Sequence, residues 1–225
     1  MTDQKNEVTT SKKAERFITN NKTILIVLLA CIICCLVGFI LGNYIGSKIK
    51  VKNLAAVENI SYELTKDSAY LETAELESRR ADAFEKLTPY VKKSGIVGVR
   101  ANMLCAELAY QQEKYEDSAN YWKAVAKKSK NNYTAPIANF NLGVCYEQLG
   151  KIDEACEAYK KASDDENFTL RDHATFSYGR VLEAKGDFKA AAEAYNSLND
   201  RNPNNTWAKL AKTRVLILQV EGKTE

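Results

Sequence analysis

The stretch NFNLGVCYEQLGKIDEACEAYKKA, residues 139–162, decides the fold. In each half, apolar or small residues recur every three or four positions, which is typical of an amphipathic helix. Gly150 lies between the halves and can take the left-handed conformation that ends a helix. Gly143 and Ala155 are small where two helices would have to approach closely. The stretch therefore predicts one helical hairpin.

The hairpin occurs three times, at intervals of 37 and 36 residues. Five positions keep this register, and the first is the small contact of the first helix, at Ala106, Gly143 and Gly179. The second helix starts at Tyr115, Ile152 and Phe188, has its small contact at Ser118, Ala155 and Ala191, and has its large aromatic residue at Trp122, Tyr159 and Tyr195. The residues that close each unit are Val125, Ala162 and Leu198. Helix pairs with this period cannot bury an apolar face alone, so they predict a stacked solenoid.

These positions resemble the tetratricopeptide repeat family, in which a Leu-Gly pair, a turn glycine, aromatic residues and alanines recur. The matching residues are Leu142, Gly143, Tyr146, Gly150, Ala155, Tyr159 and Ala162, with Pro203 where the family places its closing proline. The period is slightly longer than the usual length of about 34 residues, and Glu113-Lys114 replaces the turn glycine in the first copy. The resemblance covers residues 97–205 and implies a scaffold that binds proteins, because this fold does not specify a reaction.

An apolar run at residues 24–45 precedes the repeats, with only Asn43 and Tyr44 polar, both near its end. As a helix it would be about 33 Å long, enough to cross a hydrocarbon core of about 30 Å. We therefore expect a single transmembrane helix. Cys31 follows a Leu-Leu-Ala run typical of lipoprotein cleavage sites, so lipidation is an alternative to a retained anchor, although cleavage there would leave an apolar tail.

Basic residues on both sides of the span only slightly favour a cytoplasmic N-terminus. The expected location is the inner membrane, with the repeats on the periplasmic side. The expected division is a polar tail, a transmembrane helix, a stalk helix with a degenerate capping hairpin, three repeats, and a C-terminal capping helix with a tail. Their ranges are 1–22, 23–46, 47–96, 97–205 and 206–225. Residues 48–93 contain no proline-rich or Gly-Ser linker, so a stiff stalk is expected, and Asn205 or Thr206 can cap the last helix.

Several kinds of chemistry are not supported by the sequence. The single histidine, His173, rules out a metal site with two imidazoles, and no phosphate-binding loop, nucleophile elbow or paired-cysteine motif occurs. Acidic pairs such as Asp153-Glu154 lie at turns or helix ends, where their negative charge can interact favourably with the helix dipole. A net charge of +3, concentrated before residue 53, gives the repeats no basic surface for nucleic acid. We expect no enzyme, no cofactor and no metal.

The six cysteines fall into two groups of three. Cys31, Cys34 and Cys35 lie in the apolar span, where cysteine acts as a small apolar residue. Cys105, Cys145 and Cys156 occupy inward repeat positions, which predicts core packing. Cys145 and Cys156 are about equally distant from Gly150, so a disulfide between them is an alternative if the repeats are exported.

The resemblance also implies a binding groove, because the first helix of each pair lines the concave surface in this family. The corresponding positions are Arg100, Met103, Glu107 and Tyr110; Ile137, Phe140, Asn141 and Val144; and His173, Phe176, Ser177 and Arg180. Some of these residues could instead pack against the neighbouring repeat. The Lys and Asn clamp of certain co-chaperones is absent, since Met103 and Glu107 occupy its positions.

The order of segments is similar to that of the ancillary subunit of the bacterial Sec translocon. Arg16-Phe17 and Asn21-Lys22 precede a single span, an emerging helix and a small repeat array. In that family the repeats face the periplasm and associate with the translocon and with periplasmic chaperones. The sequence thus favours a membrane-anchored docking module in protein export or envelope biogenesis. The alternative is a structural subunit that assembles with itself, as a homo-oligomer, or with a fixed membrane complex.

Overall fold

The structure is a computed structural model that describes residues 15–129 and 133–224. Every regular element within these ranges is a helix, which confirms the all-α prediction. Two compact units make up the described chain, one ending at Lys52 and one beginning at Asn53.

The N-terminal unit is helical wherever the structure describes it. Residues 15–20 are helical. Helix α2 extends from Lys22 to Thr65, and its last turns belong to the second unit. Its most apolar 18-residue window has a mean hydropathy of 3.4, and none of that window is buried. The helix is long and apolar enough to cross a membrane.

The second unit begins with a hairpin formed by the end of α2 and by α3, Thr73–Val91, joined by the short 3-10 helix η1, Ser68–Tyr70. Val57 of α2 and Leu87 of α3 are both 0% exposed and belong to one apolar cluster with residues of the next helix, α4. Pro89 lies inside α3, close to its end, without terminating it. The hairpin covers the first face of the stack.

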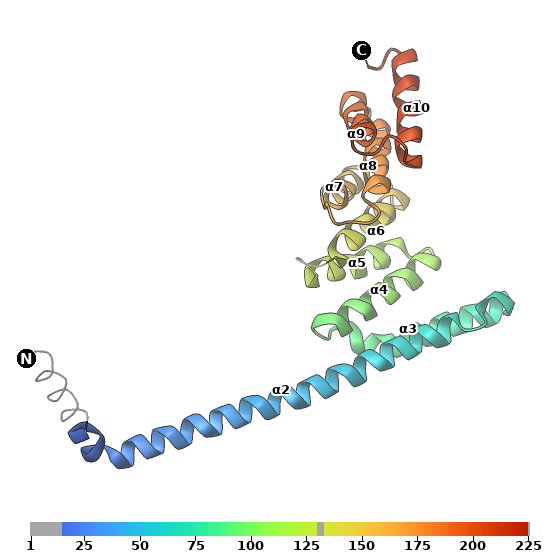
Figure 1. The fold of residues 1–225 in the computed structure, drawn as a ribbon. Helices are drawn as coiled ribbons and strands as arrows, with labels where there is room; N and C mark the ends of the chain where they lie inside the picture. Colours follow the sequence, from blue (N-terminus) through green and yellow to red (C-terminus); the bar gives the residue numbers. More distant parts are fainter. Residues whose placement is uncertain (1–14, 130–132, 225) are drawn as a thin grey trace, which may run out of the picture. The chain divides into compact units, whose positions relative to one another are not determined.

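Three further hairpins follow in the order that the repeats predict (Figure 1). We call the first helix of each pair the A helix and the second the B helix. The A helices are α4, Gly95–Gln111, α6, Thr134–Gln148, and α8, Arg171–Lys185. The B helices are α5, Tyr115–Lys128, α7, Ile152–Ser163, and α9, Phe188–Arg201. Each hairpin packs on the next, as expected for a solenoid.

The three A-to-B turns have the same backbone geometry. Gly150 and Gly186 have φ angles of 67° and 86°, and Glu113 adopts the same left-handed conformation with a φ of 59°. In each turn the following residue donates its N–H to the carbonyl five residues earlier, as in Lys151 to Tyr146 at 2.8 Å. This bond satisfies a carbonyl at the helix end. The first turn therefore forms without the glycine that the other two contain.

The helices within a hairpin are in close contact at the predicted small positions. A Cβ atom on Gly143 would lie 2.7 Å from the Tyr159 ring, and one on Gly179 would lie 2.5 Å from the Tyr195 ring. Both distances are far inside van der Waals contact, so only glycine allows the aromatic ring to lie flat against the A helix. Tyr159 and Tyr195 are 1% and 0% exposed as a result.

Helix α10, Thr206–Val220, packs on α9 and α8 at the end of the described stack. Asn205 caps it by accepting the Trp207 N–H through its side chain at 2.9 Å, which agrees with the predicted start of the helix. Ala208, Ala211 and Leu218 are buried in the same cluster as Leu198 of α9.

Candidate functional site

Two pockets lie between neighbouring A helices, at positions that repeat along the chain. The first has a volume of about 150 Å³ and is lined by Glu107, Tyr110, Gln111, Trp122, Asn141 and Val144. The second has a volume of about 320 Å³ and is lined by Phe140, Val144, Glu147, Gln148, Tyr159, His173, Ser177 and Arg180. Each residue of the first pocket has a counterpart 36 or 37 residues later in the second. The pockets are thus one feature of the repeat, formed twice.

The first pocket is aromatic and apolar at its centre. Tyr110 packs edge-on against Tyr115, with ring centroids 5.2 Å apart, and Trp122 is only 3% exposed. Loss of hydration raises the pKa of Glu107 at the rim, and the charge of Arg100 partly opposes this. Arg100 is itself held by Glu58, through hydrogen bonds of 2.7 and 2.9 Å. Apolar side chains of a ligand are the groups that suit this pocket.

The second pocket contains a three-residue clasp where the first has apolar groups. The Tyr159 hydroxyl donates to Glu147 Oε2 at 2.6 Å, and Arg180 donates to both oxygens of Glu147 at 2.6 and 2.7 Å. Burial and the neighbouring Glu147 strongly raise the pKa of Tyr159, so its O–H remains a donor at neutral pH. A bidentate arginine–carboxylate pair is strong and directional. The clasp joins α6 and α7 to α8.

A related clasp joins the third repeat to α10. The Tyr195 hydroxyl donates to Glu183 Oε1 at 2.6 Å, and Arg214 of α10 donates to both oxygens of Glu183. Burial alone would raise the pKa of Glu183, but the hydrogen bonds from Arg214 and Tyr195 outweigh it and lower that pKa. Between the first and second repeats, Tyr110, Trp122 and Val144 replace the acid, the tyrosine and the arginine.

An aromatic stack forms the far wall of the second pocket. The His173 ring stacks on Trp207 with centroids 4.0 Å apart and planes 8° apart, and Phe140 lies 4.8 Å away on another side. Phe176 also contacts Trp207, at 5.3 Å. Burial, followed by the nearby charge of Arg180, lowers the pKa of His173, so its imidazole is neutral at pH 7. The stack connects α6, α8 and α10.

The structure brings most of the predicted groove residues together. Those that line one or both pockets are Glu107, Tyr110, Phe140, Asn141, Val144, His173, Ser177 and Arg180. Four predicted residues line neither of them, namely Arg100, Met103, Ile137 and Phe176. Met103 and Ile137 pack against the core between the first and second repeats, and Ser177 is only 4% exposed. These placements show the contacts of the residues, and binding by them remains a prediction.

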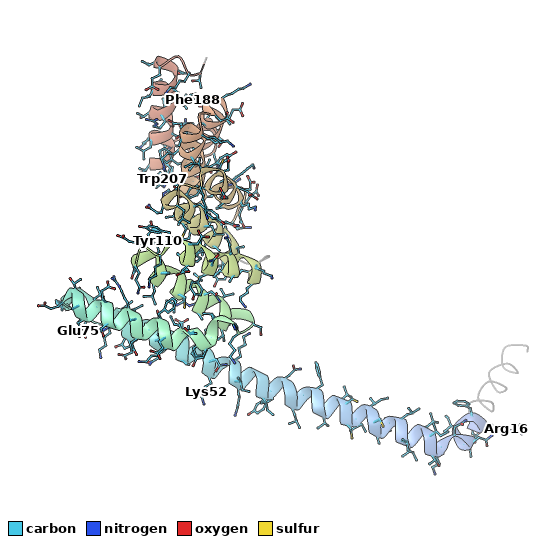
Figure 2. All side chains as sticks on the ribbon, turned by 180° about the vertical axis from the view of Figure 1, so that it is seen from behind. Arg16, Lys52, Glu75, Tyr110, Phe188 and Trp207 are labelled. Atoms are coloured by element: carbon cyan, nitrogen blue, oxygen red, sulfur yellow. The ribbon has the colours of Figure 1, made fainter. Side chains whose placement is uncertain are left out.

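Sequence reasoning omitted several lining residues. Gln111 directly follows Tyr110, Glu147 and Gln148 lie one helical turn beyond Val144, and Trp122 and Tyr159 come from the B helices. Trp207 was expected only as part of a capping helix. The helical spacing of four residues after Glu107 and Val144 was the signal that could have identified Gln111 and Gln148. Figure 2 labels Tyr110 on α4 and Trp207 on α10, and helices α6 and α8 follow one another in the stack between them.

The repeat cysteines are free thiols in separate surroundings. Cys145 is buried and its thiol lies 3.3 Å from the Ser118 hydroxyl, whereas Cys156 packs toward α8 and α9. Burial raises the pKa of the Cys105 thiol to about 12, so that thiol stays protonated. In residues 15–129 and 133–224, no three His, Cys, Asp or Glu side chains gather as metal ligands would. The core-packing prediction describes the cysteines better than the disulfide alternative.

Comparison with known proteins agrees with this geometry. The model of the tetratricopeptide repeat family matches residues 106–168 and 157–206. A TPR repeat-containing protein of Treponema pallidum is 30% identical over 130 residues, which cover 58% of this chain and 54% of the relative. A TPR repeat-containing protein of Methanocaldococcus jannaschii is 31% identical over 100 residues, covering 43% of this chain and 30% of the relative. The matches thus span about half and about a third of those relatives.

Neither relative carries an enzyme's name. The matched residues extend from the end of α4 through α9 and include the positions that line both pockets. Repeats of this kind are protein-interaction modules. Residues 106–206 of the chain therefore match the tetratricopeptide repeat family.

Proposed function

We propose that this protein is a single-pass membrane protein whose repeats hold partner proteins or peptides at the bacterial inner membrane. The process served is protein export or envelope biogenesis, and the partners are translocon subunits or envelope chaperones. The repeats lie on the periplasmic side, and the anchor concentrates the bound segment at the membrane. Such tethering raises the effective concentration of a partner without any additional contact.

The observation that carries the docking role is the pair of pockets formed at equivalent positions. Val144 lines both, so the pockets are adjacent along the A helices. A peptide laid across these helices would meet the apolar first pocket and then the second pocket with its clasp. Adjacent pockets with different chemistry give a bound segment both an orientation and a register.

The observation that supports anchoring is the exposed apolar surface of α2. Large apolar side chains remain exposed around the helix, with Ile33 at 51%, Leu36 at 55% and Phe39 at 69%. In water this surface would be costly at roughly 25 cal/mol per Å², and in a hydrocarbon core it would not be. The helix therefore fits a lipid environment.

The docking role is tested by blocking both pockets at exposed positions. In full-length protein, Gln111→Trp and Gln148→Trp place indole rings at the two rims without removing a core contact. The matched control is Asn120→Trp and Asn196→Trp, since both asparagines are exposed on B helices. After purification in mild detergent from the native membrane, the co-purifying proteins are quantified for each version.

The expected result is that wild type and the control retain the same partners and that the blocked variant loses them. Translocon subunits or envelope chaperones among those partners support the export role. Partners that persist with the blocked variant contradict groove docking. Self-association alone, unaffected by the indoles, would favour the structural-subunit alternative.

Anchoring and orientation have their own test. In intact spheroplasts, external protease should degrade the repeats, and alkaline carbonate should leave the full-length protein in the membrane fraction. Repeats that resist the external protease would contradict a periplasmic location of the repeats. Extraction of the protein by carbonate would contradict the transmembrane anchor.

A further inference from the structure

Exposed aliphatic side chains gather on α10. Among the described residues from Asn53 onward, four large aliphatic side chains are exposed, and three of them, Leu210, Leu216 and Val220, belong to this helix. Val220 is 89% exposed. A helix that closes a repeat array usually has a polar outer side, because no further repeat packs on it. The apolar outer side of α10 therefore indicates a surface that another element covers.

The contacts of α10 separate an inner side from an outer side. Trp207 and Arg214 contact α8, and Ala211 and Leu218 are buried in one cluster with residues of α9. The opposite side carries exposed residues that are four, three and four positions apart, namely Lys209, Thr213, Leu216 and Val220. We call these four residues the outer row. Because the outer row faces away from α8, a molecule bound to it leaves the second pocket open.

The outer row is complementary to a second copy of itself in antiparallel orientation. Its spacing of four, three and four residues is that of the contact seam between paired helices. In an antiparallel pair centred between residues 214 and 215, Thr213 lies opposite Leu216 of the second copy. Lys209 lies opposite Val220 of the second copy, and it can lay its methylene stem along that valine.

The charges of α10 also favour the antiparallel pair. Lys209 and Lys212 make its first half positive, whereas Glu221 and the last carbonyl groups of the helix make its end negative. Antiparallel pairing brings the ammonium of Lys209 beside Glu221 of the second copy, while parallel pairing would place lysines against lysines. Glu221 bonds to Lys223 at 2.8 Å within its own chain, but such an exposed pair contributes little and can be exchanged.

The membrane anchor proposed above favours a second copy over an unrelated partner. Two copies in one bilayer have a high effective concentration for each other, so a small contact is enough to pair them. In the apolar span, Gly38, Gly42 and Gly46 lie four residues apart, and a Cβ added at any of them would meet no described atom within 4 Å. Small residues at this spacing allow two membrane helices to pack closely.

We propose that two copies of this protein pair through the outer rows of their α10 helices, antiparallel and about a two-fold axis. The same surface serves both copies, so the contact closes as a dimer. One side of a 15-residue helix is smaller than the roughly 800 Å² per partner of a standard interface. The pair is therefore weak and depends on the shared bilayer. The dimer presents two repeat arrays whose pockets remain open.

Photo-crosslinking in vesicles of phosphatidylethanolamine and phosphatidylglycerol tests this pairing. Full-length protein with Val220 replaced by p-benzoylphenylalanine is reconstituted together with ¹⁵N-labelled protein, so that mass spectrometry distinguishes links between copies from links within one. The links between copies should join residue 220 to the segment around Lys209. The control position for the crosslinker is Leu170, which is 47% exposed and directly precedes α8. Few links between copies are expected there.

A charge exchange decides whether the occupant is a second copy. Lys209→Glu should lower the yield of links about fivefold, because each dimer loses two exposed ion pairs and gains two repulsions. Adding Glu221→Lys should restore the yield, since both partners of each contact then change sign. The matched control is Lys189→Glu with Glu193→Lys, on exposed positions of α9, which should keep the wild-type yield.

Three results would overturn the proposal: a yield at residue 220 no higher than at Leu170, links from residue 220 to lipid only, or no recovery with Glu221→Lys. The first result would do so even if the copies associate through their spans. Groove docking is judged separately by the indole variants, because the outer row lies away from the second pocket. Docking can therefore stand when the α10 pairing fails, and the pairing can stand when docking fails.

Discussion

The two inter-repeat pockets have the same backbone framework and opposite chemistry. The first is formed by Tyr110, Trp122 and Val144, and the second has Glu147, Tyr159 and Arg180 at the equivalent positions. Hydrophobic packing joins the first repeat to the second, and a hydrogen-bonded ion pair is added between the second and the third. The comparison shows that the repeat fixes where a pocket forms, and that three side chains decide what it can hold.

The difference begins inside the hairpins. Gly143 and Gly179 allow a tyrosine ring to lie on the A helix, so that its hydroxyl reaches the acid one turn later. The first hairpin has Ala106 and Trp122 instead, and Tyr110 stands where the other two hairpins have the accepting carboxylate. The clasp therefore depends on the glycine. Because the first repeat has neither, substitutions at these positions should affect the second and third repeats differently from the first.

The largest effect is expected from Gly179→Ala. The new Cβ would lie 2.5 Å from the Tyr195 ring, so the ring or the helix must move and the clasp on Glu183 must loosen. Overpacking of this kind costs about 1–3 kcal/mol. In thermal melts followed by circular dichroism, the full-length variant should unfold at a clearly lower temperature than wild type.

The matched control for that substitution is Ala106→Gly in the first hairpin. It removes a buried methyl from a helix and should cost about 1 kcal/mol through helix propensity, without disturbing a clasp. If Gly179→Ala melts at the wild-type temperature, the close ring-to-helix contact does not limit the packing of the third repeat.

The second prediction concerns the clasp of the second pocket. Glu147→Leu leaves the nearly buried Tyr159 hydroxyl without its acceptor and Arg180 without its partner, which should cost about 1–3 kcal/mol. Adding Tyr159→Phe removes the stranded hydroxyl and makes this pocket resemble the first. The double variant should therefore be more stable than Glu147→Leu alone, as a double-mutant cycle by thermal melting would show. Strictly additive losses would mean that the two side chains do not act together.

The third prediction is a smaller, pH-dependent effect at the aromatic stack. The pKa of His173 is lowered by burial and by Arg180, so the folded protein binds a proton there less readily than the unfolded chain. The stabilising contribution of the neutral ring is complete above the unfolded pKa of about 6.5 and is lost as pH falls toward the lower folded value. His173→Phe keeps a flat ring beside Trp207 and should reduce the decline in melting temperature between about pH 7 and pH 5. An identical decline in both proteins would assign it to other groups.

The sequence predicted the helices of the array well because its signals are local and repeated. Small and aromatic residues at fixed intervals indicated which faces pack, and Gly150 indicated where a hairpin turns. The glycine-dependent contact of Tyr159 with α6 followed from the same pattern. The predicted all-α solenoid is confirmed, and its repeat segment matches the family that the sequence resembles.

The pocket chemistry was harder to predict, because it depends on contacts between residues far apart in sequence. Glu147 and Arg180 lie in different repeats, and no local pattern indicates that they pair. Nothing in the order of residues indicated that Trp207 would stack on His173 from the following helix. Phe176, expected to be available to a ligand, packs instead against Tyr195 and Trp207.

The smallest expected effect lies at the turn of the first repeat, where the sequence departs from the repeat pattern. Glu113 takes the left-handed conformation that Gly150 and Gly186 take elsewhere, with a φ of 59°. A residue with a Cβ is strained there by about 1 kcal/mol, and glycine relieves this strain. Glycine also gives the unfolded chain more conformational freedom, which offsets part of the gain in stability. Glu113→Gly should therefore raise the stability of the first repeat by about 0.5 kcal/mol, whereas Gly186→Ala should lower that of the third by about 1 kcal/mol. Amide hydrogen exchange of α4 and α8 measures the two repeats separately. Faster exchange of α4 in Glu113→Gly would mean that the Glu113 side chain stabilises the turn by more than its backbone strain costs.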